Sequence, residues 1–297
     1  MNNYEVIIII GIVAPSGPLR DGDLEDIKKC IESYGHKVKF SRSCYLNHKG
    51  YLAGDDFTRC RDLEAMFLDD EVDVVMCLRG GYGAMRILDM INYDIIRSNP
   101  KIFIGFSDIT ALHLAFYKKC GLKTFHGIMG ASSPRWDKFS YKSLVDAINF
   151  KNELVLKNPK HQKIYKIFGG VAEGEIIGGN LALIVSTLGT EYEIDTKGKI
   201  LFIEDIGEPL YKLDRMMTQL KMCKKLDDCN GIIFGDFKDC ADEKDIYNLI
   251  KETLKDCKKP SIFNLKSGHC MPMLTIPLGE RCVLDANEKN IKISRKI

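Results

Sequence analysis

Hydrophobic runs alternate with helix-like periods along the first half of the chain. Short apolar runs, such as residues 6–14, are typical of buried strands in a parallel sheet. Between these runs, apolar residues recur at helical spacing, as over 55–69. The alternation predicts an α/β fold with a mostly parallel, doubly wound sheet and helices on both faces. The expected strands are 6–13, 36–40, 72–78, 101–105 and 123–125, and the expected helices are 21–34, 55–69, 84 onward and 107–120.

The second half repeats this alternation after a less regular stretch that is rich in lysine and asparagine. Its pattern predicts a smaller α/β domain with a mixed sheet. We therefore expect an N-terminal domain over 1–150, a linker region over 151–170 and a C-terminal domain over 171–297. The expected strands are 172–178, 199–203, 230–234, 261–264, 273–276 and 281–293, and the expected helices begin at 180, 210 and 242.

Composition narrows the function classes. The 297 residues include 43 Lys+Arg and 41 Asp+Glu, which gives a net charge of +2. This near-neutral balance argues against a general nucleic-acid binder, which usually shows a basic excess or stripe. The 45% of hydrophobic residues is ordinary for a globular chain that needs no disulfide or metal to hold its core.

The cysteines and the most apolar segment both predict an intracellular location. The 11 cysteines are scattered, without a Cys-x-x-Cys motif, which suits free thiols in a reducing cytosol. The run 6–14 is too short to span a bilayer, and no Lys or Arg precedes it as in a signal peptide. We expect a cytoplasmic protein with no membrane partner. No pair of histidines has the spacing of a metal site.

Two loops follow predicted strands at the edge where open parallel sheets bind ligands. In Gly105-Phe-Ser-Asp-Ile-Thr110, Ser107 comes directly after a strand and begins a helix, whose dipole favours developing negative charge there. This resembles a nucleophile elbow, although Ile109 replaces the second glycine. The alternative is that Ser107 is a simple helix N-cap.

The second loop is Arg79-Gly-Gly-Tyr-Gly83. Its backbone N–H groups, free of side-chain bulk, could form an oxyanion hole or hold a phosphate. The spacing matches neither a dinucleotide fingerprint nor a Walker loop, and a tight turn is the alternative.

A serine nucleophile needs a base and an acid that orients it. Of six histidines, His126 after a strand and His269 in a glycine-flanked loop remain candidates. Glu204 and Asp205 end a buried strand, where a carboxylate needs a partner or a role. The alternative is a charge at a helix N-terminus, which suits Asp205 and Glu208 better than Glu204.

The combined motifs resemble the LD-carboxypeptidase family of serine peptidases, which includes the microcin C self-immunity peptidases. The segments occur in family order along the whole chain and are together specific. They are Ala14-Pro-Ser-Gly-Pro18, Leu78-Arg-Gly-Gly-Tyr-Gly83, Lys101-Ile-Phe-Ile-Gly-Phe-Ser-Asp-Ile-Thr-Ala-Leu-His113, Gly178-Gly-Asn-Leu181, Leu188-Gly-Thr190, Phe202-Ile-Glu-Asp-Ile-Gly-Glu208 with Tyr211 and Asp214-Arg215, Gly268-His269 and Ile276-Pro-Leu-Gly279.

The resemblance implies a catalytic triad divided between two α/β domains. Ser107 on the first domain matches the nucleophile, and Glu204 and His269 on the second match the acid and the base. The amides of Gly81 and Asp108 match the oxyanion donors. The resemblance also implies a homodimer and a reaction without a metal or other cofactor.

By resemblance, the substrate is a murein tetrapeptide of peptidoglycan recycling, and the leaving group is its terminal D-alanine. Arg79, Arg86 and Arg215 are candidates for the carboxylate that this residue carries, and Tyr82 is a further candidate for substrate contact. An immunity peptidase that cleaves an aminoacyl-nucleotide is the alternative within the family. A non-enzymatic two-lobed ligand-binding protein and a nucleotide-binding enzyme are alternatives outside it.

Overall fold

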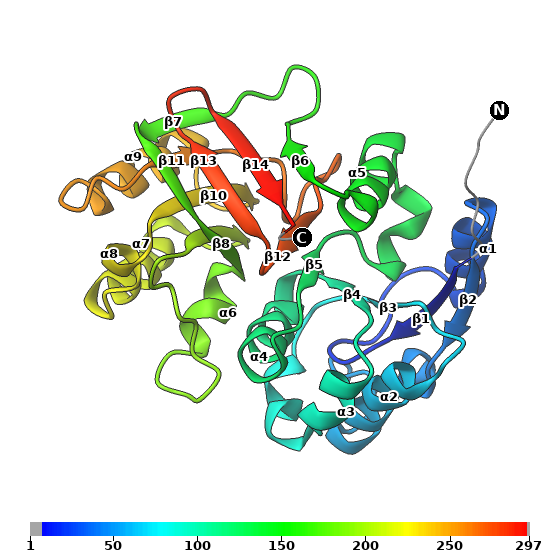
Figure 1. Ribbon diagram of the computed structural model, residues 1–297. Helices are drawn as coiled ribbons and strands as arrows, with labels where there is room; N and C mark the ends of the chain where they lie inside the picture. The colour runs from blue at the N-terminus through cyan, green and yellow to red at the C-terminus, as the bar shows by residue number, and fades with distance from the viewer. Residues whose placement is uncertain (1–7, 296–297) are drawn as a thin grey trace. The chain divides into compact units, whose positions relative to one another are not determined.

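The computed structural model describes residues 8–295 (Figure 1). They form two compact units, which meet in the sequence between Trp136 and Asp137. Both units combine helices with a sheet, so the predicted two-domain α/β class is confirmed. No helix among the described residues is both long and apolar enough to cross a bilayer.

The sheet of the first unit is parallel, as the apolar runs predict. Its strands lie in the order β2-β1-β3-β4-β5, and each neighbouring pair is parallel. They are β1 (Ile9–Val13), β2 (Lys37–Phe40), β3 (Val74–Cys77), β4 (Ile102–Gly105) and β5 (Thr124–His126). Residues 6 and 7 of the first expected strand lie outside the described residues.

Helices connect these strands, and an Asp or Asn side chain caps the first three of them. The Asp23 carboxylate accepts a hydrogen bond from the Glu25 amide (3.1 Å) and so caps the first helix. Phe67, Phe103 and Phe116 pack together in the core, with ring centroids as close as 5.0 Å. The α-helices are α1 (Leu24–Ser33), α2 (Asp56–Leu68), α3 (Tyr93–Ser98) and α4 (Thr110–Cys120); short 3₁₀ turns are η1 (Arg42–Tyr45), η2 (Ala84–Met90), η3 (Ser107–Ile109) and η4 (Gly130–Arg135).

The second unit is built on a mixed sheet, as expected. Its strands lie in the order β6-β14-β13-β8-β9-β10-β11-β7; the neighbours from β8 to β11 are parallel, and the other neighbouring pairs are antiparallel. The strands of this unit are β6 (Glu153–Leu156), β7 (Tyr165–Phe168), β8 (Val171–Asn180), β9 (Ile200–Ile206), β10 (Gly231–Lys238), β11 (Ser261–Phe263), β12 (Ile276–Leu278), β13 (Arg281–Asp285) and β14 (Asn290–Ser294).

Side chains from most of these strands form one core that includes Ile176, Phe202 and Ile233. The Asn180 side chain accepts a hydrogen bond from the Leu183 amide (3.2 Å) and caps the helix that follows β8. The helices of this unit are α5 (Lys138–Asn149), α6 (Leu181–Ser186), α7 (Leu210–Met222), α8 (Lys225–Asp228) and α9 (Glu243–Thr253).

The structure divides the chain differently from the expected domain bounds. Helix α5 belongs to the second unit, although the sequence analysis assigns it to the first. The expected linker, 151–170, contains β6 and β7. Both strands pair with strands much later in the chain, β14 and β11, and a local pattern does not show such pairing. The second unit is consequently the longer of the two.

Candidate active site

Ser107 lies at a sharp turn between β4 and α4. Its φ of 65° is in the left-handed region, which a residue with a side chain rarely adopts. The residue does not act as a cap, because the N-cap positions of η3 and α4 are Phe106 and Ile109, and neither makes a side-chain cap hydrogen bond. A strained, half-buried serine between a strand and a helix is the local geometry of a nucleophile elbow.

Gly80 lies directly against the Ser107 side chain. A Cβ atom on Gly80 would lie 2.8 Å from Cβ and 3.0 Å from Oγ of Ser107. The same atom would lie 3.3 Å from the backbone nitrogen of Asp108. The glycine loop therefore meets both the proposed nucleophile and one proposed oxyanion donor within the first unit. Gly81 and Gly83 have positive φ angles of 119° and 129°, as a loop with unusual backbone angles requires.

The Asp108 carboxylate joins three loops at the same sheet edge. It accepts hydrogen bonds from the Ser16 hydroxyl (2.5 Å) in the loop after β1 and from the Ala84 amide (2.8 Å) at the end of the glycine loop. Burial raises the pKa of this carboxyl, and the two hydrogen bonds oppose that shift. The side chain thus holds the backbone whose amide is the expected oxyanion donor.

Two arginines also hold the glycine loop. Arg59 on α2 is fully buried, and its Nη1 donates to the carbonyls of Pro15 and Gly83. The half-buried Arg79 donates from Nη1 to the Pro18 carbonyl (3.0 Å). Each guanidinium therefore links the loop after β1 to the loop after β3.

The second unit brings the expected acid and base together. Glu204, fully buried in β9, lies with Oε2 at 2.7 Å from Nδ1 of His269. Because a carboxylate only accepts, Nδ1 donates the proton and Nε2 is left as the basic nitrogen. Gly268 permits this contact: its φ is 122°, and a Cβ there would lie 2.6 Å from Oε2 of Glu204.

Electrostatics favours a stronger base at His269. Burial by itself lowers the pKa of the imidazole. The charge and the hydrogen bond of Glu204 raise this pKa, the charges of Asp205 and Asp236 raise it as well, and together they outweigh the effect of burial. The net pKa lies above the ordinary 6.5. A carboxylate that stabilises the imidazolium is what a general base paired with serine needs.

The neighbouring carboxylates have other contacts. Asp205 accepts from the Asn180 side chain (2.9 Å) and the Ala182 amide (3.1 Å), at the beginning of α6. Burial raises its pKa to about 6. Glu208 forms an ion pair with Lys212 (3.2 Å) on the first turn of α7. Both positions suit the alternative of charges near a helix N-terminus, whereas Glu204 contacts a histidine.

The remaining candidates make contacts of other kinds. His126 is buried at the end of β5, where its ring packs against Phe106 (5.8 Å between centroids). Arg86 forms two hydrogen bonds with the Asp56 carboxylate (2.9 and 2.5 Å). Arg215, exposed on α7, lies over the Tyr211 ring at 5.7 Å. None of these observations assigns them a part in the reaction.

The sequence matches two family models over most of its length. Residues 10–127 match the LD-carboxypeptidase N-terminal domain, and residues 173–284 match the LD-carboxypeptidase C-terminal domain. The chain belongs to the LD-carboxypeptidase family. It is therefore a serine-type carboxypeptidase, and the family resemblance of the motifs is confirmed.

Individual LD-carboxypeptidase relatives cover nearly the whole chain. A "probable murein peptide carboxypeptidase" of Bacillus subtilis is 41% identical over 96% of this chain and 91% of its own length. The microcin C7 self-immunity protein MccF, in an inactive mutant apo state, superposes with a TM-score of 0.91 at 26% identity, covering 99% of this chain and 97% of that one. A muramoyltetrapeptide carboxypeptidase of Oxalobacter formigenes gives 0.83 at 25%, covering 96% and 97%.

Sequence reasoning about this LD-carboxypeptidase missed three residues that shape the first half of the site. The Gly-Gly pair in the loop after β3 indicates a close backbone approach, but the sequence alone does not tell that Gly80 is the glycine that faces Ser107. Ser16 belongs to the family motif Ala14-Pro-Ser-Gly-Pro18, which follows β1 at the same sheet edge as Ser107, but the motif alone gives Ser16 no role. Arg59 had no signal, because it looks like any charged residue of an amphipathic helix.

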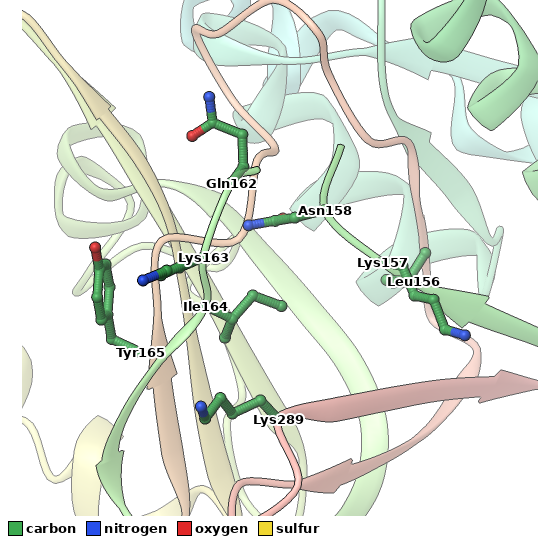
Figure 2. A pocket seen from close by; sticks show the side chains of 8 residues that line it. All are labelled: Leu156, Lys157, Asn158, Gln162, Lys163, Ile164, Tyr165 and Lys289. Atoms are coloured by element: carbon green, nitrogen blue, oxygen red, sulfur yellow. The ribbon is translucent and has the colours of Figure 1, made fainter. Parts of the chain in front are cut away.

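A separate pocket of about 350 Å³ lies in the second unit, where the segment between β6 and β7 approaches the turn between β13 and β14 (Figure 2). Three lysines are among its lining residues, which are Leu156, Lys157, Asn158, Gln162, Lys163, Ile164, Tyr165 and Lys289. None of them belongs to the candidate catalytic set. In the chain from 8 to 295, no cluster of three or more His, Cys, Asp or Glu residues has the arrangement of a metal site.

Proposed function

We propose that this protein removes the terminal D-alanine from murein tetrapeptides by means of Ser107, His269 and Glu204. The observation that carries the proposal is the 2.7 Å contact between Glu204 and Nδ1 of His269, which leaves Nε2 to act on a hydroxyl. The left-handed turn at Ser107 supports its role as nucleophile. Membership of the LD-carboxypeptidase family supports the bond class, and the names of the relatives support the substrate class.

The reaction follows the logic of serine acyl transfer. Nε2 of His269 takes the Ser107 proton as the oxygen attacks the carbonyl of the L-centre that precedes D-alanine. The amides of Gly81 and Asp108 stabilise the oxyanion. His269, now protonated and stabilised by Glu204, gives its proton to the leaving amine as D-alanine departs. A water molecule, activated by the same imidazole, then hydrolyses the acyl-enzyme. This mechanism requires the imidazole and the hydroxyl to meet in the working enzyme.

The decisive experiment is incubation of the purified protein with a murein tetrapeptide, followed by mass spectrometry. We expect the loss of one terminal alanine and no cleavage elsewhere. Ser107→Ala should retain the circular dichroism spectrum and lose activity on the order of 10⁴–10⁶-fold, because the three residues act as a unit. Activity of Ser107→Ala comparable to that of the unaltered protein would exclude the mechanism.

Cleavage of an aminoacyl-nucleotide, as in microcin C immunity, is the second candidate. The TM-score of 0.91 with MccF favours it, while the 41% identity to the Bacillus relative favours the murein substrate. Both bonds are amide or amide-like and need the same three residues. Parallel assays with a murein tetrapeptide and an aminoacyl sulfamoyl adenosine distinguish the two candidates by their relative kcat/KM.

We also propose that the protein is a cytoplasmic homodimer. The family resemblance supports the dimer, and the 11 free cysteines suit a reducing compartment. Light scattering coupled to size exclusion tests the dimer: a mass of one chain at micromolar concentration would contradict it. Cell fractionation tests the location.

A further inference from the structure

Arg79 has an environment that differs from those of two other arginines near the glycine loop, Arg59 on α2 and Arg86 on η2. Among the described residues, its guanidinium donates one hydrogen bond, and the acceptor is a neutral group, the Pro18 carbonyl. Within 8–295, no carboxylate lies at salt-bridge distance from its guanidinium, which is half-buried. Burial lowers its pKa, Arg20 adds to this effect, and Asp21 and Asp108 oppose it. A guanidinium keeps its charge under these conditions, so it retains unused donors for an anion.

Arg59 and Arg86, by contrast, already have a carboxylate partner, which they share. Arg59 forms an ion pair with Asp56 and is fully buried, so a ligand has no access to it. Arg86 holds the same carboxylate with two hydrogen bonds. Of the three arginines, only Arg79 combines partial exposure with an unpaired charge among the described residues.

The guanidinium of Arg79 packs on the glycine loop that contacts Ser107, where it could bind a substrate group close to the scissile bond. A Cβ on Gly81 would lie 3.4 Å from Nη1 and 3.5 Å from Nη2 of Arg79, so the guanidinium packs over this glycine. Gly81 follows Gly80, whose own Cβ position is 3.0 Å from Oγ of Ser107. In a substrate, the carbon of a terminal carboxylate is three bonds, or about 3–4 Å, from the scissile carbonyl carbon, so a cation that binds this carboxylate must lie near the nucleophile. The guanidinium packs on the same glycine loop that contacts the nucleophile.

We propose that Arg79 binds the free carboxylate of the leaving residue and so restricts the enzyme to the last peptide bond of its substrate. This inference rests on the proposed function, which supplies the nucleophile and the scissile bond. A guanidinium binds a carboxylate through two parallel N–H···O contacts, and this fork also orients the residue that leaves. Arg79 is then a specificity-determining residue for a terminal α-carboxylate, in addition to linking the loops after β1 and β3.

The test compares a tetrapeptide that has a free terminal carboxylate with the same peptide ending in a carboxamide. We expect the unaltered enzyme to prefer the free acid by about 30- to 1,000-fold in kcat/KM, the range for a desolvated charge pair. In Arg79→Met, the ratio of kcat/KM for the acid to kcat/KM for the amide should fall to about one, whatever common loss of rate follows from the missing link to the Pro18 carbonyl. Arg79→Lys, which retains the charge but not the fork, should retain part of the preference.

Arg61→Met is the matched control, because Arg61 is an exposed arginine of the same unit that pairs with Glu64 (3.0 Å). It should leave both rates unchanged. If Arg79 only braces the loop, Arg79→Met lowers both rates equally, and this result overturns the inference. Should Arg79→Met not fold, an unchanged acid preference in Arg79→Lys overturns it as well. An unaltered enzyme that cleaves neither peptide refutes the proposed function together with this inference, whereas cleavage without a preference for the acid refutes the inference alone.

Discussion

A single methyl group on Gly80 should disturb the nucleophile without disturbing the fold. In Gly80→Ala, the new Cβ would lie 2.8 Å from Cβ of Ser107, where carbon atoms normally keep about 3.5–4.0 Å. The contact is with an atom bonded directly to the backbone, which no rotamer change can move. Gly80 itself has no positive φ, so alanine is compatible with its backbone conformation.

The magnitude follows from the displacement. Restoring a normal separation moves Ser107, or the loop that faces it, by about 0.7–1.2 Å. A misplacement of about 1 Å at a reacting group costs on the order of 10²-fold in rate, or about 2.7 kcal/mol of transition-state stabilisation. Because the same atom lies 3.3 Å from the Asp108 nitrogen, the displacement also affects an expected oxyanion donor. The loss should therefore appear in kcat rather than in KM.

The assay measures kcat and KM for D-alanine release together with thermal unfolding. Gly130→Ala is the matched control, since its Cβ would meet only ordinary contacts, the nearest being Cδ1 of Ile12 at 3.4 Å. We expect the control to retain both its activity and its Tm. A Gly80→Ala enzyme with unaltered kcat would refute the assignment of Ser107 as nucleophile at this turn. A loss of kcat with a large fall in Tm would instead indicate general damage to the unit.

The remaining predictions concern the two charged networks. Arg59→Met should lower the free energy of unfolding by roughly 2–4 kcal/mol, because the carbonyls of Pro15 and Gly83 stay buried and lose this donor. Urea denaturation measures this change, and an unchanged midpoint would contradict the described contacts. In the pH profile of kcat/KM, the acidic limb should lie above 6.5, because His269 must be neutral to accept a proton and its pKa is raised. Glu204→Gln removes the charge that raises this pKa, so the limb of the residual activity should move to lower pH; a shift in the opposite direction would refute the pairing.

The sequence was sufficient for the parts of the fold that depend on local pattern. Strands buried on both faces read as continuous apolar runs, and β1, β3 and β4 lie inside the ranges expected for them. It was insufficient for β6 and β7, whose partners β14 and β11 are distant in sequence. Pairing of that kind depends on tertiary context, which a window of neighbouring residues does not contain.

The candidate site likewise includes residues that the sequence indicates and residues that only the structure reveals. The residues alone make Ser107 and Glu204 candidates, because each follows or ends a predicted buried strand, but an N-cap remains the alternative for Ser107, and the family resemblance is needed to choose Glu204 as the acid. The base was left open between His126 and His269 until the motifs were compared as a set, since the contact with Glu204 joins residues that are far apart in the chain. Arg59 could not be found, because only its complete burial distinguishes it from a surface arginine.

Each half of the proposed chemistry is organised within its own unit. The charges that raise the pKa of His269 are Glu204, Asp205 and Asp236, all of the second unit. The contacts that hold the glycine loop come from Arg59, Arg79 and Asp108, all of the first. A polar group fixed in advance by its own fold does not have to be reorganised when the substrate arrives, which is the main source of electrostatic catalysis. The strength of the base and the geometry of the oxyanion donors are therefore separate properties, and a substitution in one unit should change one of them without changing the other.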